Sequence, residues 1–298
     1  MQTTPQHWHI GLVGYGEVGR ILAEDLRAQG VTVSAYDIKL DSPASAAPLQ
    51  AHAAQHGVQL ASSGAALAAQ ADFIISAVTA SQTVGVAQAC APALQLGAYF
   101  LDFNSASPGA KQRAASLIDG AGGRYVEGAV MTSVPPHRIK VPLLLGGTFA
   151  AELAPLINSL GFAAKVTSDQ LGVASATKMC RSVMIKGLES LLSESLLAAR
   201  HYGVERDVLQ SLQNLLPATD WSQLSRYMIS RSLLHGQRRC EEMREAARSV
   251  QETGIDPLMS NAIALRQEWT ASLGVDPAIP TLEAMLDAML RSRGELRC

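Results

Sequence analysis

The sequence predicts an α/β fold, in which a doubly wound, mostly parallel sheet is followed by an all-α region joined to it by a long helix. Three features of the chain predict this fold. Apolar strand-like segments alternate with Ala-rich helical segments up to about residue 166, a glycine-rich turn follows the first strand, and only helical segments follow residue 167. The 298 residues are 48% apolar and 17% charged, so the chain can form one large domain or two of ordinary size.

The glycine-rich turn is the strongest functional signal. The apolar segment 10–13 runs directly into the pattern Gly-x-Gly-x-x-Gly, formed by Gly14, Gly16 and Gly19, and the helix-forming segment 20–27 follows. Gly14 permits the tight turn, Gly16 lets a pyrophosphate approach the backbone, and Gly19 lets the helix pack against the strand. The N–H groups at the start of the helix would face the phosphates. The pattern predicts a Rossmann-type dinucleotide site, with Gly14, Tyr15, Gly16, Glu17, Val18 and Gly19 as its phosphate-binding residues.

Asp37 bears on which dinucleotide is bound. It ends the second strand-like segment, residues 31–36, and lies 18 residues after Gly19. A carboxylate at this place accepts hydrogen bonds from ribose hydroxyls and repels a 2′-phosphate, which favours NAD over NADP. Lys39 acts in the opposite direction. We therefore predict NAD as cofactor, with NADP as the alternative.

Five further apolar segments are predicted as strands, at residues 73–78, 99–103, 125–130, 141–145 and, more weakly, 163–166. Helical segments at residues 81–94 and 110–121 separate the earlier ones, and residues 42–54 are predicted as a loop leading into a short helix. Parallel sheets bind ligands beyond the carboxyl ends of their strands. Residues at three such ends are therefore candidate ligand contacts: Val78 and Thr79, Asn104 and Ser105, and Met131, Thr132 and Ser133.

The helical region is predicted to begin at a capping box, with Thr167 as N-cap and Gln170 reaching back. A proline-free segment then runs to about residue 200 and stops before Gly203. Further breaks follow near Pro217 and at residues 254–257 and 274–280. We therefore predict two domains, a dinucleotide-binding domain at residues 1–167 and an all-helical domain at residues 168–298.

Lys178 is the candidate catalytic residue of the long helix. It follows small residues at 172–176, and Ser182 and Lys186 lie near the same helix face. Desolvation in such a setting disfavours the charged amine and lowers the pKa of a lysine toward a catalytic range. A surface lysine whose stem lies along the helix is the alternative. For Lys186, a surface charge paired with Glu189 or Glu194 is favoured over a second anion contact.

Composition excludes several classes of function. The net charge is −2 and no basic stripe is present, which argues against nucleic-acid binding. No apolar run reaches the roughly 18 residues of a membrane span, and residues 1–9 lack the apolar core of a signal peptide. His52 and His56 are spaced i,i+4 without a nearby acidic residue in their segment, so a solvated helix face is favoured over a metal site. The cysteines lack a CxxC pair and are typical of reduced thiols in a cytoplasmic protein: Cys90, Cys180, Cys240 and Cys298.

The motifs together resemble the β-hydroxyacid dehydrogenase superfamily, which includes 6-phosphogluconate dehydrogenase, 3-hydroxyisobutyrate dehydrogenase and the imine reductases. The resemblance covers nearly the whole chain. Residues 10–19 are similar to the cofactor motif of the superfamily, residues 125–147 to its substrate-motif strand pair, and residues 172–182 to its catalytic helix. Lys178 falls at the position of the catalytic lysine.

Two further segments, residues 102–108 and 235–243, are most similar to a branch described only as 6-phosphogluconate-dehydrogenase-like. The substrate motif departs from the superfamily pattern Asp-x-Pro-Val-Ser-Gly-Gly. Met131 stands where a serine holds the substrate carboxylate, and Thr132 and Ser133 replace the two glycines. We therefore expect the chemistry to be retained and the substrate to differ, with a less polar pocket suited to a bulkier or aromatic compound.

The resemblance implies reversible hydride transfer between NAD(P) and the secondary alcohol of a 3-hydroxy acid or a related β-hydroxy compound, with Lys178 as general acid and base. Val78 and Thr79 would line the cofactor path, and Asn104 would contact the nicotinamide ribose or carboxamide. An Asx turn is the alternative role for Asn104. The candidate substrate contacts are Thr132, Ser133 and Ser182, where a polar turn is the alternative for the first two.

Two other functions compete with this prediction. An imine reductase would share the scaffold, but such enzymes usually carry aspartate or tyrosine where this chain has Lys178. A non-catalytic dinucleotide sensor would need a partner surface or a DNA-binding module, and the sequence shows neither. Members of the superfamily commonly form dimers, and the helical region is rich in Leu and Met, so we expect a cytoplasmic homodimer acting on a small molecule.

Overall fold

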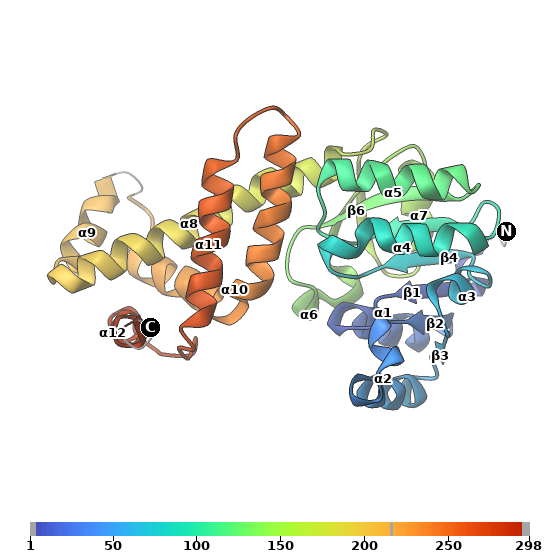
Figure 1. Ribbon diagram of the computed structural model, residues 1–298, viewed down its shortest axis with the longest axis horizontal. Helices are drawn as coiled ribbons and strands as arrows, with labels where there is room; N and C mark the ends of the chain where they lie inside the picture. The colour runs from blue at the N-terminus through green and yellow to red at the C-terminus, as the bar shows by residue number, and fades with distance from the viewer. Residues whose placement is uncertain (1–3, 215–216, 294–298) are drawn as a thin grey trace. The chain divides into compact units, whose positions relative to one another are not determined.

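The computed structural model describes residues 4–214 and 217–293. The chain divides into two compact units, Met1–Lys178 and Met179–Cys298. The first unit contains the sheet and the second is helical (Figure 1). Helix α8 (Val173–Tyr202) begins in the first unit and continues into the second.

The sheet of the first unit has eight strands in the order β3-β2-β1-β4-β5-β6-β7-β8. Neighbouring strands are parallel, except for the antiparallel pair β6 and β7. This arrangement confirms the predicted α/β fold class. The strands are β1 (His9–Val13), β2 (Thr32–Tyr36), β3 (Gln59–Leu60), β4 (Phe73–Ser76), β5 (Tyr99–Asp102), β6 (Arg124–Val130), β7 (Pro142–Gly146) and β8 (Ala163–Ser168).

Both faces of the sheet are covered, because successive side chains of a strand point to opposite faces. In β4, Phe73 and Ile75 join the apolar cluster that includes residues of α1 (Glu17–Ala28), α2 (Pro43–His56) and α7 (Ala150–Asn158). Ile74 joins the cluster of the opposite face. That face is covered by α3 (Gly64–Ala68), α4 (Thr83–Cys90) and α5 (Pro108–Gly120). The short elements of this unit are α6 (Val134–His137), η1 (Pro5–His7), η2 (Ile38–Asp41), η3 (Ala80–Gln82), η4 (Ala91–Ala93) and η5 (Arg138–Lys140).

Two predicted boundaries are wrong. Residues 42–54 form helix from Pro43 onward, because a proline in the first turn has no N–H to satisfy and already has a helical φ. Thr167 is not an N-cap, since β8 continues through it to Ser168. The hydroxyl of Ser168 accepts a hydrogen bond from Gln170 N (3.0 Å), and α8 starts only at Val173, after Gly172 turns the chain with a φ of +100°.

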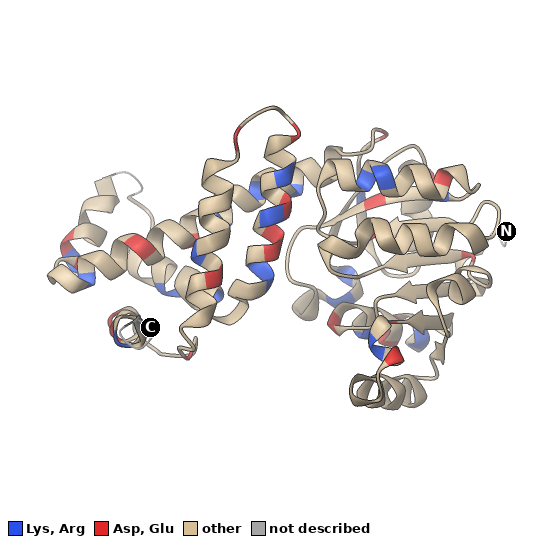
Figure 2. Ribbon diagram, viewed as in Figure 1, with Lys and Arg blue, Asp and Glu red and all other residues tan. Residues whose placement is uncertain are grey.

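The helical unit contains the remainder of α8 and α9 (Glu205–Ser211), η6 (Leu212–Asn214), α10 (Trp221–Gln251), α11 (Leu258–Ser272) and α12 (Leu282–Arg293). The predicted breaks separate these helices. Helices α10 and α11 pack closely at Gly236, where an added Cβ would collide with the backbone of Gln267. Acidic and basic residues are interleaved along α10 (Figure 2). No helix in the described part of the chain is long and apolar enough to cross a membrane.

Candidate active site

The glycine turn has the geometry that a dinucleotide requires. Gly14 has a φ of +97°, and a Cβ there would collide with the backbone of Ala77 at the end of β4. A Cβ at Gly19 would collide with the carbonyl oxygen of Gly14, so the helix lies directly against the turn. An added Cβ at Gly16 would meet no atom within 4 Å. The backbone at the start of α1 is therefore open at the one glycine that a pyrophosphate has to approach, which fits a bound dinucleotide.

The other residues of the turn differ in what they can offer a cofactor. Tyr15 has a fully buried side chain, so it can present only its backbone. Glu17 is exposed in the first turn of α1, and Val18 packs against the core. Asp37 is tied to the turn, because one carboxylate oxygen accepts from Tyr15 N (2.8 Å) and the other from Lys39 N (3.0 Å). These contacts hold the carboxylate in place, and each oxygen keeps acceptor capacity for a ribose hydroxyl.

Asn104 links the ends of two neighbouring strands. Its Oδ1 accepts a hydrogen bond from Val78 N (2.7 Å), and its Nδ2 donates to Ser76 Oγ (3.0 Å). The side chain is buried, with 3% of its surface exposed. Asn104 thereby fixes the segment after β4, in which Val78 is half-buried and Thr79 is exposed. Its observed hydrogen bonds fix the backbone after β4, where the cofactor path is predicted, and use one of the two Nδ2 hydrogens.

A buried ion pair between Lys111 and Asp102 stabilises this edge of the sheet. Asp102, the last residue of β5, accepts from Lys111 Nζ (2.8 Å), Tyr125 Oη (2.6 Å) and Asn104 N (3.0 Å). Lys111 also donates to the carbonyl oxygens of Asp102 (2.8 Å) and Gly128 (3.3 Å). Burial raises the pKa of Tyr125 well above its ordinary value, with Asp102 adding to the shift, so the hydroxyl stays a donor. The cluster fixes the backbone that carries Asn104.

Lys178 lies beside the next residue of that edge. Its Nζ donates a hydrogen bond to Ser105 Oγ (2.5 Å), and the lysine is half-buried. Glu127, buried within β6, places the start of α8. Its Oε1 accepts from Gly172 N (2.9 Å) and Ala174 N (3.0 Å), and its Oε2 accepts from the hydroxyl of Ser175 (2.8 Å).

The sequence indicated Ser105 only as a residue at a strand end, without a role in the site, and Glu127 was not predicted as a site residue. The available signals were a hydroxyl next to Asn104 at a strand end and an acid inside an apolar strand. Glu127 does the capping that the prediction assigned to Thr167. An acid in a buried strand has to be satisfied by hydrogen bonds, and free N–H groups at a helix start provide them.

Most predicted cofactor and substrate residues of the first unit lie at one edge of the sheet. They follow β1, β2, β4, β5 and β6, and these strands are parallel, so their carboxyl ends meet at the same edge. Thr132 and Ser133 belong to this group. Thr132 is exposed, and Ser133 is half-buried at the start of α6.

Ser182 lies in the second unit, where its hydroxyl accepts from Lys186 Nζ (3.0 Å). Both residues are buried. Lys186 pairs with Glu242 (2.8 Å) and not with Glu189 or Glu194, so its predicted role as a surface charge is wrong. Burial lowers the pKa of Lys186, and the Glu242 carboxylate opposes that shift. The sequence could not predict Glu242 as the partner, because the packing of α8 with α10 brings it to Lys186.

The histidine pair also differs from its prediction. His52 is half-buried, and its Nε2 lies 2.9 Å from Glu24 Oε1, while its Nδ1 lies 2.8 Å from Tyr15 Oη. The rings of His52 and His56 are stacked, with centroids 4.5 Å apart. The expectation of a solvated face without an acidic partner is therefore wrong. The acid comes from α1, 28 residues before His52, and the packing of α1 against α2 brings it there.

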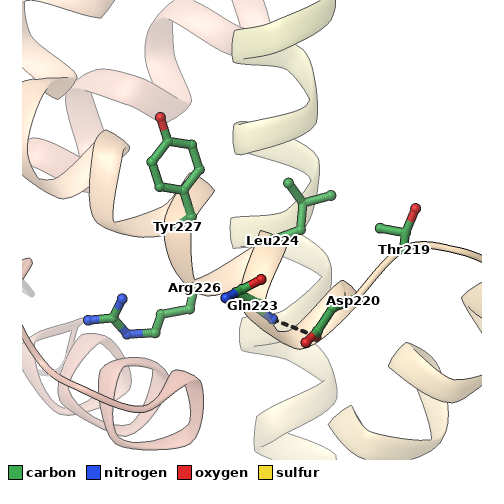
Figure 3. Close-up of a pocket in the computed structure, with 6 residues that line it drawn as sticks. All are labelled: Thr219, Asp220, Gln223, Leu224, Arg226 and Tyr227. Carbon is green, nitrogen blue, oxygen red and sulfur yellow. Dashed lines mark hydrogen bonds between the residues drawn. The ribbon is translucent and has the colours of Figure 1, made fainter.

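A shallow hollow lies at the start of α10 (Figure 3). None of the residues that line it was predicted as a site residue. Two of its polar side chains, Asp220 and Arg226, already serve the fold. Asp220 Oδ1 accepts from Gln223 N (2.9 Å) as the N-cap of α10, and Arg226 Nε donates to Ile279 O (3.1 Å). We therefore do not assign the active site to this hollow.

The chain is similar to known proteins in sequence and in structure. Residues 9–158 match the family model of the NAD binding domain of 6-phosphogluconate dehydrogenase, and residues 199–270 match a domain of unknown function, DUF1932. A conserved hypothetical protein of Sinorhizobium meliloti 1021 is 36% identical, with a TM-score of 0.79, over 95% of this chain and 96% of that one.

Two other solved structures are similar over nearly the whole chain. A conserved protein of unknown function, whose structure is described as similar to 3-hydroxyacid dehydrogenases, is 30% identical with a TM-score of 0.71, over 95% of this chain and 99% of that one. Mycobacterium tuberculosis 3-hydroxyisobutyrate dehydrogenase, solved with L-serine, is 16% identical with a TM-score of 0.72, over 95% of this chain and 99% of that one. The last likeness concerns the fold alone.

Proposed function

This chain belongs to the family of the NAD binding domain of 6-phosphogluconate dehydrogenase, and we propose that it is a dehydrogenase that uses Lys178 to oxidise the secondary alcohol of a 3-hydroxy acid or a related β-hydroxy compound. The superfamily predicted from the motifs is confirmed, and with it an NAD(P)-dependent oxidoreductase scaffold. The observation that carries the proposal is the contact between Lys178 Nζ and Ser105 Oγ (2.5 Å). This contact supports the proposal because Ser105 follows β5, at the sheet edge where the proposed cofactor residues lie.

The proposed cofactor contacts are backbone N–H groups at Gly16 and the start of α1 for the pyrophosphate, and Asp37 for the adenosine ribose. Asp37 favours NAD, since its carboxylate is held by Tyr15 N and Lys39 N and would repel a 2′-phosphate. Val78 and Thr79 line the path to the nicotinamide, and Asn104 holds that path in place. When bound, the nicotinamide accepts or supplies the hydride.

In the proposed oxidation, the neutral amine of Lys178 takes the proton of the substrate hydroxyl while the C–H bond breaks and the C=O bond forms. The resulting ammonium can donate to Ser105, which holds the charge at the edge of the sheet. In reduction Lys178 returns the proton to the alkoxide oxygen. Thr132, Ser133 and Ser182 are the proposed hydroxyl donors to the substrate.

The test is hydride transfer followed at the nicotinamide absorbance, with 3-hydroxy acids, β-hydroxy amino acids, aryl-substituted diols and cyclic imines. We expect Lys178→Ala to lower kcat by roughly 10²- to 10⁴-fold on the substrate that is turned over, while NADH binding measured by fluorescence is unchanged. Lys165→Ala, on β8, is the matched control and should retain full activity. Equal turnover by wild type and Lys178→Ala would disprove the proposal, and turnover of imines alone would favour a C=N reductase.

We also propose that the protein is a cytoplasmic homodimer. Large apolar side chains of the second unit are exposed, among them Met184 (74%), Leu191 (58%) and Leu234 (58%). Such surface is unusual for a monomer and suits a self-complementary interface. Cys90, Cys180 and Cys240 are free thiols, which suits a reducing compartment, while Cys298 lies outside the described residues. The molar mass in solution tests the dimer.

A further inference from the structure

We propose that Glu24, His52 and His56 form a binding site for a divalent transition-metal ion, with Zn²⁺ as the best-suited ion. One ligand atom from each side chain lies within 4.8 Å of the other two. Two imidazoles and one carboxylate are a ligand set that suits Zn²⁺, and three protein ligands leave the fourth position to water or an added ligand. The inference does not rest on the proposed function.

The two helices that carry these residues place them on facing surfaces. His52 and His56 are one turn apart on α2, so they share a helix face. Glu24 stands on α1, and its Oε1 already lies 2.9 Å from His52 Nε2. Zinc ligands at about 2.0–2.1 Å from the ion lie roughly 3.3 Å from one another. The observed spacings, which reach at most 4.8 Å, have to shorten toward this value when an ion is bound.

Tyr15 provides a hydrogen-bond partner for the ring nitrogen of His52 that does not face the proposed ion. Its buried hydroxyl lies 2.8 Å from His52 Nδ1. With an ion on Nε2, the ring proton sits on Nδ1 and is donated to Tyr15 Oη. Such a contact fixes the tautomer and the ring orientation of a metal ligand. Tyr15 is also part of the glycine turn. Its backbone belongs to the dinucleotide loop, while its hydroxyl faces the proposed metal site.

Arg138 orients the carboxylate without blocking it. Its guanidinium binds Glu24 Oε2 (2.7 Å) and Asp25 Oδ1 (2.8 Å), which leaves Glu24 Oε1 directed at His52. Among the described non-glycine residues, Arg138 alone has a positive φ, 54°. The two carboxylates hold it in that strained conformation. With both acids present, the positive charge of Arg138 is balanced, and Glu24 and Asp25 together can accommodate an added cation.

The experiment is calorimetric titration of the full-length chain with Zn²⁺, supported by the visible spectrum of Co²⁺. A Cys180→Ser, Cys298→Ser background removes the exposed thiol of Cys180 and the terminal thiol as competing ligands. We expect one ion per chain and a loss of at least roughly 10-fold in affinity for His56→Ala. Among the described residues, none makes a hydrogen bond with the His56 ring, so its removal should leave the fold intact, as far-UV circular dichroism would verify.

Two further variants make the test decisive. Glu24→Gln retains the size of the side chain and a contact to His52, but it weakens the ligand set, so Zn²⁺ affinity should fall as in His56→Ala. His201→Ala removes an exposed histidine of the second unit and should leave affinity unchanged. Equal Zn²⁺ affinity with and without His56→Ala in the Cys180→Ser, Cys298→Ser background, or absence of binding at tens of micromolar Zn²⁺, would overturn the proposal. Both readouts are independent of enzymatic turnover, so failure of the proposed function would not affect them.

Discussion

The two units each contain a buried charge cluster, and the clusters differ in how completely their polar atoms are satisfied. In the sheet unit, Asp102 receives hydrogen bonds from a lysine, a tyrosine and a backbone amide. In the helical unit, Glu189 pairs with Arg239 and accepts from Gln267 Nε2 (3.1 Å). Within the described part of the chain, Arg239 Nε and Gln267 Oε1 are buried without a hydrogen-bond partner.

The difference follows from the kind of secondary structure that surrounds each cluster. The end of β5 offers backbone groups without a ladder partner, and the Asp102–Lys111 pair uses the amide of Asn104 and the carbonyl oxygen of Asp102 there, together with the carbonyl oxygen of Gly128 in the neighbouring strand β6. Residues inside long helices have backbone groups that are already bonded, so a side chain there depends on other side chains. We therefore expect the sheet cluster to contribute strongly to the free energy of unfolding. Replacing the helical cluster by apolar residues should change that free energy little.

Removal of Lys111 should have the largest effect. Lys111→Met leaves Asp102 as a buried carboxylate without its cation, which should lower the free energy of unfolding by about 3–5 kcal/mol. Denaturant unfolding followed by the fluorescence of Trp8, which lies in the core of this unit, measures it. Lys140→Met makes the same chemical change at an exposed position and should stay within about 0.5 kcal/mol of wild type. Similar values for the two variants would contradict the role given to the pair.

Matched double variants compare the clusters directly. Asp102→Asn with Lys111→Met removes both charges of the sheet cluster, and Glu189→Gln with Arg239→Met does so in the helical unit. The first should still lower the free energy of unfolding by about 2–3 kcal/mol, because the backbone acceptors of Lys111 lose their donor. The second should lie within about 1 kcal/mol of wild type, because an ion pair removed as a whole leaves no unpaired charge. A reversed order would show that the unpartnered atoms of the helical cluster are satisfied by water.

The comparison also shows what the sequence could predict. Local patterns were sufficient for the glycine turn, the strand ends and the breaks between helices, since each depends on neighbouring residues. The pairings Glu24 with His52 and Lys186 with Glu242 join residues far apart in the chain. Only the packing of helices sets them, so charge and spacing within one segment gave the wrong environment for both. Glu127 lies between these cases, because a buried acid signals that a partner exists without identifying it.

The smallest effect concerns two cysteines, one from each unit. Burial raises the pKa of Cys90 from 9.0 to about 12, whereas Cys180 is exposed on α8. A folded-state pKa above the unfolded value means that the unfolded chain releases the proton first. The stabilisation is therefore complete below pH 9 and is lost as pH rises toward 12.

Cys90→Ser removes the titrating group and keeps a hydroxyl in place of the thiol that donates to Gly64 O (3.7 Å). Between pH 8 and about pH 10, wild type should lose about 1 kcal/mol more unfolding free energy than Cys90→Ser. Cys180→Ser, at an exposed site, should follow the wild-type profile. The measurement is the urea midpoint at each pH, and the variant difference cancels the alkaline contributions of Tyr15 and Tyr99, whose pKa values burial also raises to about 12. Parallel profiles for wild type and Cys90→Ser would mean that water reaches this face of the sheet between α3 and α4.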